Sequence, residues 1–358
     1  MDPFLRKLEI ELPIIQAPMA GVSTPEMAAA VSNAGGLGSI GVGAVDANAT
    51  RQMITAVRAR TKRPFQVNVF CHKPAVADTA REASWLARLE PEFARFGAKP
   101  PIRLTEIYQS FLTDDAKLAV LLAERPAIVS FHFGVPARDR IEALRTAGIV
   151  LFATATNLEE GKIIAAAGID AVVAQGYEAG GHRGVFDPDR ADDRLGTVAL
   201  TRLLMRKLDI PVIAAGGIMD GAGITASLTL GAVAAQLGTA FIACPESSAD
   251  AGYRAALLGS AAEHTVMTAA ISGRPARCLT NRFTALAEGV EREAIPNYPI
   301  AYDAGKALHA AAKAAGEFGC GAQWAGQGAP LARALSAAEL VACLRNEMEM
   351  ALSGRSTR

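Results

Sequence analysis

The sequence predicts an α/β fold: a (β/α)8 TIM barrel with a second, smaller, mainly helical domain over the C-terminal face of the barrel. Short apolar runs alternate with amphipathic helical stretches about eight times over roughly 230 residues. The apolar runs are nearly continuous, which is typical of strands buried on both faces of a parallel sheet. Several helical stretches end at a glycine, as helices commonly do. An open, doubly wound sheet is the alternative architecture.

The expected elements follow one another in chain order. The strands are expected at residues 12–18, 37–42, 65–70, 127–133, 149–155, 169–175, 210–215 and 232–237. The helices between them are expected at residues 25–34, 47–60, 137–147, 158–167, 198–208 and 221–230. The glycines expected to cap four of these helices are Gly35, Gly148, Gly168 and Gly231.

Two stretches interrupt this alternation and suggest the domain organisation. Residues 71–126 are long and charged, and we expect a helical excursion on the barrel rim. The alternation stops after residue 243, so residues 1–243 are expected to form the barrel and residues 244–335 a substrate or lid domain over its mouth. A capping box at Ser336 and Glu339 predicts a final helix over 336–352 that packs back on the barrel.

Composition and charge exclude several classes of protein. Of 358 residues, 51% are hydrophobic and 20% are charged, which allows a large core and argues against general disorder. Lys and Arg total 36, as do Asp and Glu, so no basic surface for nucleic acid or an anionic membrane is expected. The N-terminal segment is charged and no apolar run could span a bilayer, which predicts a soluble, cytoplasmic protein. Five scattered cysteines without a CxxC pair predict free thiols, with no disulfide and no metal site.

The glycine patterns differ in what they indicate. A formal GxGxxG at residues 36–41 follows a helix and forms a strand, so we interpret it as a close-packed strand rather than a dinucleotide fingerprint. Three glycine-rich turns, at residues 175–184, 214–218 and 236–239, follow the sixth, seventh and eighth strands. In a barrel these turns lie side by side at the C-terminal face. Their backbone N–H groups can approach a phosphate closely, which predicts a phosphate site.

Polar residues at strand ends indicate what carries the phosphate. Gln16, Asn68 and Gln175 stand in otherwise apolar strands. Buried amides need hydrogen-bond partners, and an isoalloxazine ring offers several. Among the five histidines, only His182 follows a strand inside a glycine-rich turn, where it could exchange a proton with a ligand. His132 ends the fourth strand, where it is expected either to contact the substrate or to support the site from behind.

The other histidines, His72, His264 and His309, are expected to be superficial or structural. Cys244 lies near the position of a catalytic cysteine in inosine-monophosphate-dehydrogenase-like barrels. Its Ala-Cys-Pro setting lacks an activating neighbour, so we do not expect it to be a nucleophile.

Several segments, in this order, resemble the nitronate monooxygenase family, formerly called 2-nitropropane dioxygenase. The resemblance covers about Pro13 to Arg333, and two C-terminal segments resemble the first class of that family. The segments are QAPMAG, QVNVF, SFHFG, AQGYEAGGHRG, VIAAGGI, AAQLGTAF, YPIAYDAGKAL and WAGQGAPLAR. The resemblance implies noncovalent FMN, no metal, and His182 as the catalytic histidine. It places cofactor contacts at Ala17, Pro18, Met19, Asn68, Gln175, Gly180, Gly181, Gly217, Gln236, Leu237, Gly238 and Thr239.

The activity that the resemblance implies is FMN-dependent oxidative denitrification of alkyl nitronates by O2, a detoxification reaction. Propionate 3-nitronate is the expected substrate type, with neutral nitroalkanes as further substrates, and whether the chain forms a homo-oligomer is left open. One alternative is an FMN-dependent NAD(P)H reductase of quinones or enoyl thioesters. The other is a non-catalytic flavin-binding barrel.

The expected anion contacts come from the C-terminal part of the chain. Tyr298, Tyr302 and Lys306 recur every four residues, so a helix across 298–306 would place them on one face, where they could bind the anionic substrate. A lysine on the solvated side of an exposed helix is the alternative reading. Tyr108 and Tyr253 are weaker candidates for the same lining.

Overall fold

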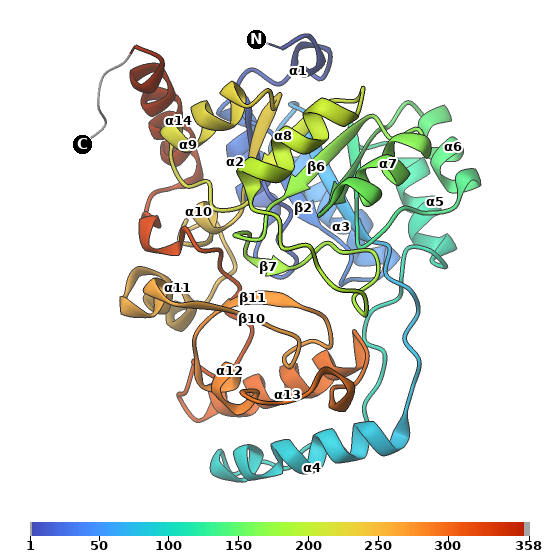
Figure 1. The fold of residues 1–358 in the computed structure, drawn as a ribbon, viewed down its shortest axis with the longest axis vertical. Helices are drawn as coiled ribbons and strands as arrows, with labels where there is room; N and C mark the ends of the chain where they lie inside the picture. The colour runs from blue at the N-terminus through green and yellow to red at the C-terminus, as the bar shows by residue number, and fades with distance from the viewer. Residues whose placement is uncertain (1, 354–358) are drawn as a thin grey trace.

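A closed barrel of eight parallel strands forms the centre of the computed structural model, which describes residues 2–353 (Figure 1). The strands pair in the order β1-β9-β8-β6-β5-β4-β3-β2, and a bridge between Ile15 and Leu37 joins the two ends. Two backbone hydrogen bonds of 2.9 Å support that closure. The strands are β1 (Ile14–Gln16), β2 (Gly38–Gly41), β3 (Phe65–Phe70), β4 (Ile128–His132), β5 (Val150–Ala155), β6 (Ala171–Gln175), β8 (Val212–Ala215) and β9 (Ala234–Leu237). The predicted barrel and its eight strands are confirmed.

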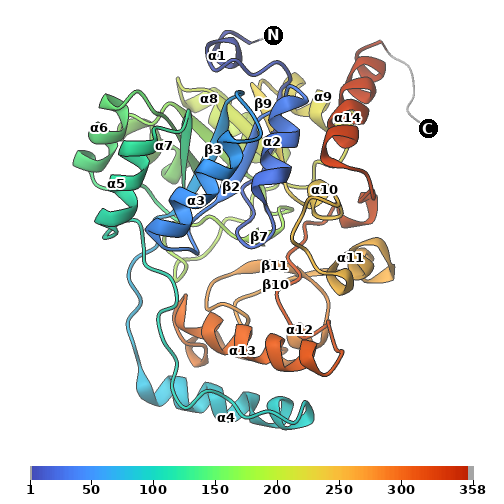
Figure 2. The ribbon, with the colours of Figure 1, turned by 180° about the vertical axis from the view of Figure 1, so that it is seen from behind.

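Helices cover the outside of the barrel, as Figure 2 shows from behind. Their inward faces are apolar and pack on strands that are buried on both sides, which explains the continuous apolar runs of the sequence. They are α2 (Pro25–Asn33), α3 (Ala47–Arg58), α5 (Asp115–Glu124), α6 (Arg138–Thr146), α7 (Leu158–Ala166), α8 (Thr197–Lys207), α9 (Gly221–Thr229) and α14 (Ala337–Leu352). Helix α1 (Pro3–Lys7) packs in a separate cluster, in which Leu5 joins Ile15 and Phe152 of the barrel strands. The capping box at Ser336 begins α14, which packs against α9 and α2.

The GxGxxG glycines belong to the barrel wall. A Cβ on Gly38 would lie 1.8 Å from the backbone oxygen of Ala28 in α2, and one on Gly41 would lie 2.9 Å from the backbone nitrogen of Ala20. Strand β2 therefore approaches its neighbours more closely than any side chain would allow. The interpretation of this motif as a close-packed strand is confirmed.

A smaller unit lies over the C-terminal face of the barrel (Figure 1). It contains α11 (Ala251–Leu258), α12 (Arg282–Leu286), α13 (Ile300–Ala314) and three 3-10 turns at residues 260–263, 292–294 and 329–331. It also contains an antiparallel sheet that the sequence analysis did not predict. In this sheet β10 (Thr265–Thr268) pairs with β11 (Ala276–Leu279), and β11 pairs with β7 (Gly181–His182) from the barrel. A short helix, α10 (Thr239–Ile242), leads from the last barrel strand to this unit.

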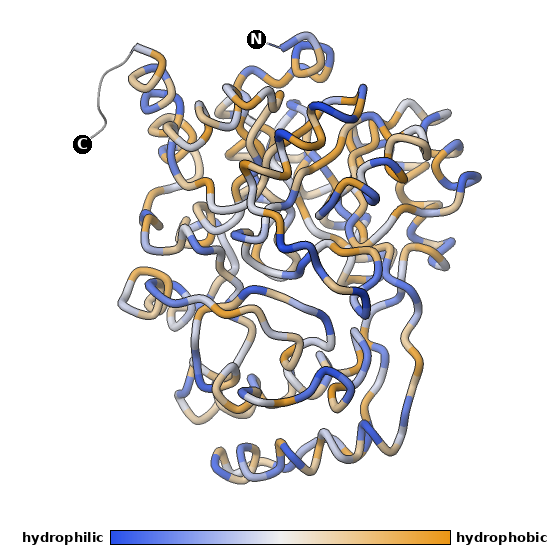
Figure 3. Tube along the Cα trace, viewed as in Figure 1, coloured by the Kyte–Doolittle hydropathy of each residue, from blue (hydrophilic) through white to orange (hydrophobic). Residues whose placement is uncertain are grey.

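Helix α4 (Thr79–Arg95) extends away from the barrel, so its predicted place on the barrel rim is wrong. Its apolar residues Trp85, Leu89 and Phe93 recur every four residues and pack into one cluster with α13. Figure 3 shows hydrophobic and hydrophilic residues alternating along α4. A bidentate ion pair between Arg282 and Glu92, with both N···O distances at 2.7 Å, fixes the helix further. Helix α4 packs on α13 because each helix presents an apolar face to the other.

No helix of the described residues combines the length and the apolar character that a bilayer crossing needs.

The packing of α4 gives a stability prediction. Phe93→Ala removes a fully buried ring and should lower the free energy of unfolding by about 3–5 kcal/mol. Ile102→Ala is the matched control because Ile102 is fully exposed, and it should change that free energy by less than about 0.5 kcal/mol. Urea unfolding followed by circular dichroism measures both. Equal effects of the two substitutions would contradict the packing described for α4.

Candidate active site

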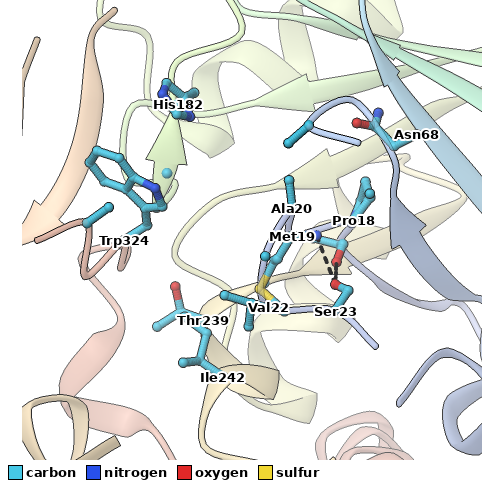
Figure 4. Close-up of a pocket in the computed structure, with 18 of the residues that line it drawn as sticks. Pro18, Met19, Ala20, Val22, Ser23, Asn68, His182, Thr239, Ile242 and Trp324 are labelled. Carbon is cyan, nitrogen blue, oxygen red and sulfur yellow. Dashed lines mark hydrogen bonds between the residues drawn. The ribbon is translucent and has the colours of Figure 1, made fainter. Parts of the chain in front are cut away.

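A cavity of about 780 Å³ opens where the C-terminal ends of the barrel strands face the smaller unit. This is the face at which barrel enzymes place their active sites, and the volume is that of a typical ligand site. Figure 4 shows His182 beside Trp324, with Asn68 on the opposite side. The lining runs from Ala17 to Gly328, so both units contribute to it.

Almost all residues predicted for the site line this cavity. They are Ala17, Pro18, Met19, Asn68, His132, Gln175, Gly180, Gly181, His182, Gly217, Gln236, Gly238, Thr239, Tyr298, Tyr302 and Lys306. Leu237 is the exception, because its side chain is 1% exposed and packs in the core beside α9. Its backbone oxygen instead accepts a hydrogen bond of 2.8 Å from Ala17, which holds the first loop at the cavity edge.

The glycine-rich turns form a backbone cradle. Gly217 adopts φ +71°, which favours glycine. A Cβ on Gly180 would lie 2.4 Å from the backbone nitrogen of Gly326, so the turn after β6 touches the C-terminal segment directly. The backbone N–H of Gly326 donates to Thr239 Oγ1 at 2.9 Å. Glu178 accepts from both the backbone N–H and the hydroxyl of Thr197, which anchors the same turn to α8. Such a cradle fits the phosphate of a nucleotide cofactor.

The remaining polar groups fit a flavin ring. Gln236 Oε1 is buried without a hydrogen-bond partner among the described residues. Asn68 Nδ2 donates to the backbone oxygen and the hydroxyl of Ser130, at 3.1 and 2.8 Å, which leaves Oδ1 as an acceptor for a ligand. An orphaned buried acceptor costs free energy unless a ligand supplies a donor. The isoalloxazine ring of FMN has such a donor, so these residues fit the cofactor that the sequence predicts.

The backbone oxygen of His182 is held by two side chains. Gln175 Nε2 donates to it at 3.0 Å, and His132 Nε2 lies 3.2 Å away. Burial lowers the pKa of His132 to about 4, so the ring is neutral and its single N–H lies on Nε2. His132 Nδ1 then accepts from Thr154 Oγ1 at 3.1 Å. The side-chain oxygen Oε1 of Gln175 accepts a hydrogen bond of 2.7 Å from the backbone N–H of Gly184. Both ring nitrogens of His132 have partners, so we assign His132 to positioning His182 rather than to the substrate.

The ring of His182 lies among aromatic rings. Its centroid is 5.1 Å from that of Trp324, 5.3 Å from Tyr298, 5.8 Å from Phe133 and 5.9 Å from Tyr302. Burial lowers the pKa of His182 to about 3, and the positive charge of Arg274 adds to this effect. The free protein therefore presents a neutral imidazole, which can accept a proton.

Arg274 places a buried positive charge behind these rings. Its side chain is 3% exposed and lies 4.2 Å above the centre of the Phe133 ring. No carboxylate of the described residues lies within ion-pair distance of it, and it donates to the backbone oxygen of Val185. Burial lowers the pKa of Arg274 to about 10, so the group stays charged at neutral pH. A buried cation without an ion-pair partner favours an anion nearby, and the ring of Phe133 separates this one from the cavity.

The predicted anion contacts meet at the cavity mouth. Lys306 Nζ lies 4.8 Å from the ring centre of Tyr108 and 5.4 Å from that of Tyr302. The helix begins at Ile300 rather than at residue 298, yet Tyr298 still reaches the cavity, with its hydroxyl buried and unpartnered among the described residues. Tyr253 donates its hydroxyl to the backbone oxygen of Trp324, which makes it a support for the wall.

The other histidines and Cys244 occupy varied positions. His72 is buried rather than superficial, and its ring meets Tyr298 edge-on at 5.0 Å. His309 lines the cavity, and His264 is exposed. Burial raises the pKa of Cys244 to about 12, which suits an inert thiol. In residues 2–353, no cluster of three or more His, Cys, Asp or Glu side chains is placed to hold a metal ion.

Sequence reasoning missed Ser272, Arg274 and Trp324 as parts of the site. Trp324 stands within the C-terminal WAGQG segment, and that motif could have identified it. Ser272 and Arg274 lie in the turn between β10 and β11, and no spacing or motif in the sequence marks them.

Comparisons with known proteins agree with one another. A model of the family described as Nitronate monooxygenase matches residues 2–347. The nitronate monooxygenase of Paraburkholderia phytofirmans is 64% identical over 345 residues, which cover 96% of this chain and 94% of that protein. That of Pseudomonas aeruginosa is 58% identical over 349 residues, which cover 97% and 99%.

Solved structures share the fold. The nitroalkane oxidase of Streptomyces ansochromogenes superposes with a TM-score of 0.89 at 42% identity, covering 97% of this chain and 98% of that one. FabK of Thermotoga maritima superposes with a TM-score of 0.74 at 28% identity, covering 99% and 98%.

The buried His72 gives a pH prediction. Burial lowers its pKa from 6.5 to about 4, so its stabilising effect is complete above pH 6.5 and is lost as the pH falls towards 4. Between pH 7 and pH 5 the wild type should lose about 2 kcal/mol more unfolding free energy than His72→Phe. Urea unfolding at both pH values measures this difference. His264→Phe, at an exposed position, is the control, and parallel pH curves for wild type and His72→Phe would contradict the prediction.

Proposed function

The chain belongs to the nitronate monooxygenase family and is an oxidoreductase, and from that premise we propose that it oxidises alkyl nitronates with FMN and O2. The observation that carries the proposal is the neutral ring of His182, enclosed by aromatic side chains in a cavity with a backbone cradle. Arg274 lies behind this cavity, over the ring of Phe133. A nitronate is a small anion, and each part of this arrangement suits its binding or formation.

The backbone cradle at Gly180, Gly217 and Gly238 would hold the phosphate of the proposed cofactor, and Asn68 and Gln236 would contact its ring; all five residues line the cavity. Leu237 contributes only through its backbone. Bound FMN would supply one-electron transfer between the nitronate and O2. The protein supplies binding, orientation and the electrostatic setting.

The protein's own groups act on the substrate in three ways. His182 accepts the carbon-bound proton of a neutral nitroalkane, or binds the nitronate that arrives already ionised. The positive charge of Arg274 behind Phe133 favours the anion in either case. The rings of Tyr298, Tyr302 and Trp324 exclude water from the ring of His182 and thereby strengthen that attraction.

Propionate 3-nitronate is the proposed substrate type because it carries a second negative charge. Its distal carboxylate suits Lys306 and the phenols at the cavity mouth. We place the reaction in the cytoplasm as a detoxification, with the nitronate and O2 as its small-molecule partners.

Anaerobic mixing tests the proposed function against the reductase alternative, which shares the barrel and the cradle. The purified protein is mixed with propionate 3-nitronate and, separately, with NADH, and the flavin absorbance is followed. We expect a spectral change with the nitronate alone, and heat release should yield FMN on chromatography. A change with NADH alone would establish the reductase, and recovered FAD or no flavin would contradict the cofactor assignment.

His182→Asn should retain FMN but lose turnover with neutral nitroalkanes by on the order of 10²–10⁴-fold, because the proton acceptor is gone. Oxidation of a preformed nitronate needs no proton abstraction and should fall less. His309→Asn, at another cavity-lining histidine, is the control. Oxygen uptake measures both substrates. Small and equal losses for both would remove His182 from proton transfer.

Lys306→Met should raise the KM for propionate 3-nitronate roughly tenfold or more, through loss of a charge-assisted contact. A nitronate with a plain alkyl chain should be affected less. Lys313→Met is the matched control, since Lys313 lies two turns along the same helix and pairs with Asp250 at 2.8 Å. Oxygen-uptake kinetics with both nitronates measure the effect, and an unchanged KM for both would leave Lys306 a solvated surface residue.

A further inference from the structure

Ser272 is a buried residue that contacts the ring of His182 from the smaller unit. It lies in the turn between β10 and β11 and is 0% exposed. Its Oγ is 2.9 Å from His182 Nε2, 3.1 Å from the backbone oxygen of Arg274 and 3.3 Å from the backbone nitrogen of Arg274. The turn itself is fixed, because Arg292 Nη2 donates to the backbone oxygen of Gly273 at 2.9 Å.

The single hydroxyl proton of Ser272 has two possible acceptors, the backbone oxygen of Arg274 and His182 Nε2. The backbone N–H of Arg274 already donates to the same hydroxyl. Among residues 2–353, no other group donates to the oxygen of Arg274. If Ser272 donated to His182, that buried oxygen would be left without a partner. The penalty for an orphaned acceptor favours donation to Arg274 by roughly five- to hundred-fold.

The direction of the Ser272 hydroxyl proton determines which ring nitrogen of His182 carries a proton. Because the Ser272 proton goes to Arg274, Nε2 of the neutral His182 must be the donor in its contact with Ser272. Nδ1 then carries the lone pair. Nδ1 has no hydrogen-bond partner within the described residues. It is also not one of the buried side-chain atoms that lack a partner, so it is not fully enclosed by protein. Since the ring lines the cavity, Nδ1 is the ring nitrogen accessible from it.

We propose that Ser272 is a positioning residue that holds His182 in the Nε2–H tautomer and so makes Nδ1 the atom that takes the substrate proton. The catalytic part rests on the proposed function. When a neutral nitroalkane reacts, its carbon–hydrogen bond breaks and an N–H bond forms at Nδ1. The electron pair of the broken bond moves into the nitro group and gives the nitronate anion. The resulting imidazolium keeps its Nε2–H bond to Ser272, so no second proton needs to move.

Nitrogen NMR of the histidine rings tests the tautomer without any turnover. The holoenzyme labelled with ¹⁵N-histidine is measured at neutral pH, and the His182 signals are assigned by their loss in His182→Asn. We expect a protonated Nε2 and an unprotonated Nδ1 in the wild type. The opposite pattern in the wild type would overturn the proposal by itself, whether or not any variant folds.

Substitution tests the part played by Ser272. Ser272→Ala should shift the His182 signals towards a mixture of tautomers, whereas His132, held by Thr154 and a carbonyl, should keep its own pattern as an internal reference. Ser247→Ala is the matched control, since Ser247 is also buried, donates to a backbone oxygen and accepts a backbone N–H two residues on. Unchanged His182 signals in Ser272→Ala would overturn the role of Ser272.

Kinetics separate this proposal from the proposed function. Ser272→Ala should lower turnover of neutral nitroalkanes relative to that of preformed nitronates, and Ser272→Thr, which keeps the hydroxyl, should restore the ratio. An unchanged ratio in Ser272→Ala would overturn the assignment of Nδ1 as the proton acceptor. If the NMR pattern is as expected but the wild type oxidises no nitronate, the proposed function fails while the tautomer assignment stands.

Discussion

The double hydrogen bond to the backbone oxygen of His182 is the constraint on which the rest of the site depends. Side chains from the ends of two barrel strands converge there, because Gln175 ends β6 and His132 ends β4. Two buried donors fix this carbonyl and thereby hold the end of the glycine-rich turn that leads from β6 to His182. The imidazole of His182 contacts Ser272 of the smaller unit. The barrel thus fixes the backbone of His182, and the smaller unit fixes its ring.

Strand β7 makes the two units interdependent. It consists only of Gly181 and His182, and it pairs with β11 of the smaller unit through Arg277 and Ala276. The carbonyl of His182 is therefore hydrogen-bonded to side chains of the barrel, and its strand is paired with β11 of the second sheet. A movement of the smaller unit would displace the histidine itself as well as the walls around it. This arrangement suits a site in which one ring must be held to within a fraction of an ångström.

The parts of the fold that the sequence predicted are those with strong local signals. The barrel strands are buried on both faces, and burial leaves continuous apolar runs such as that of β3, residues 65–70. Strand β10 is only half buried along its length, so its residues show no such run, and the second sheet was missed. The position of α4 was missed because an amphipathic stripe shows that a helix packs, but not against which surface. Ser272 was missed for a related reason: its role depends on a proton shared with Arg274, which only the folded arrangement reveals.

The contact between Gly180 and Gly326 also bears on how the protein is made. The last barrel strand ends at Leu237, whereas the cradle needs the backbone of Gly326, about 90 residues further along the chain. At ordinary translation rates that interval lasts roughly 5 to 20 seconds. During it, a nascent chain holds every strand of the barrel but only an unfinished mouth. Completion of the cradle is therefore a late event in biosynthesis, and a ribosome that stalls within this interval leaves a chain that has no complete site.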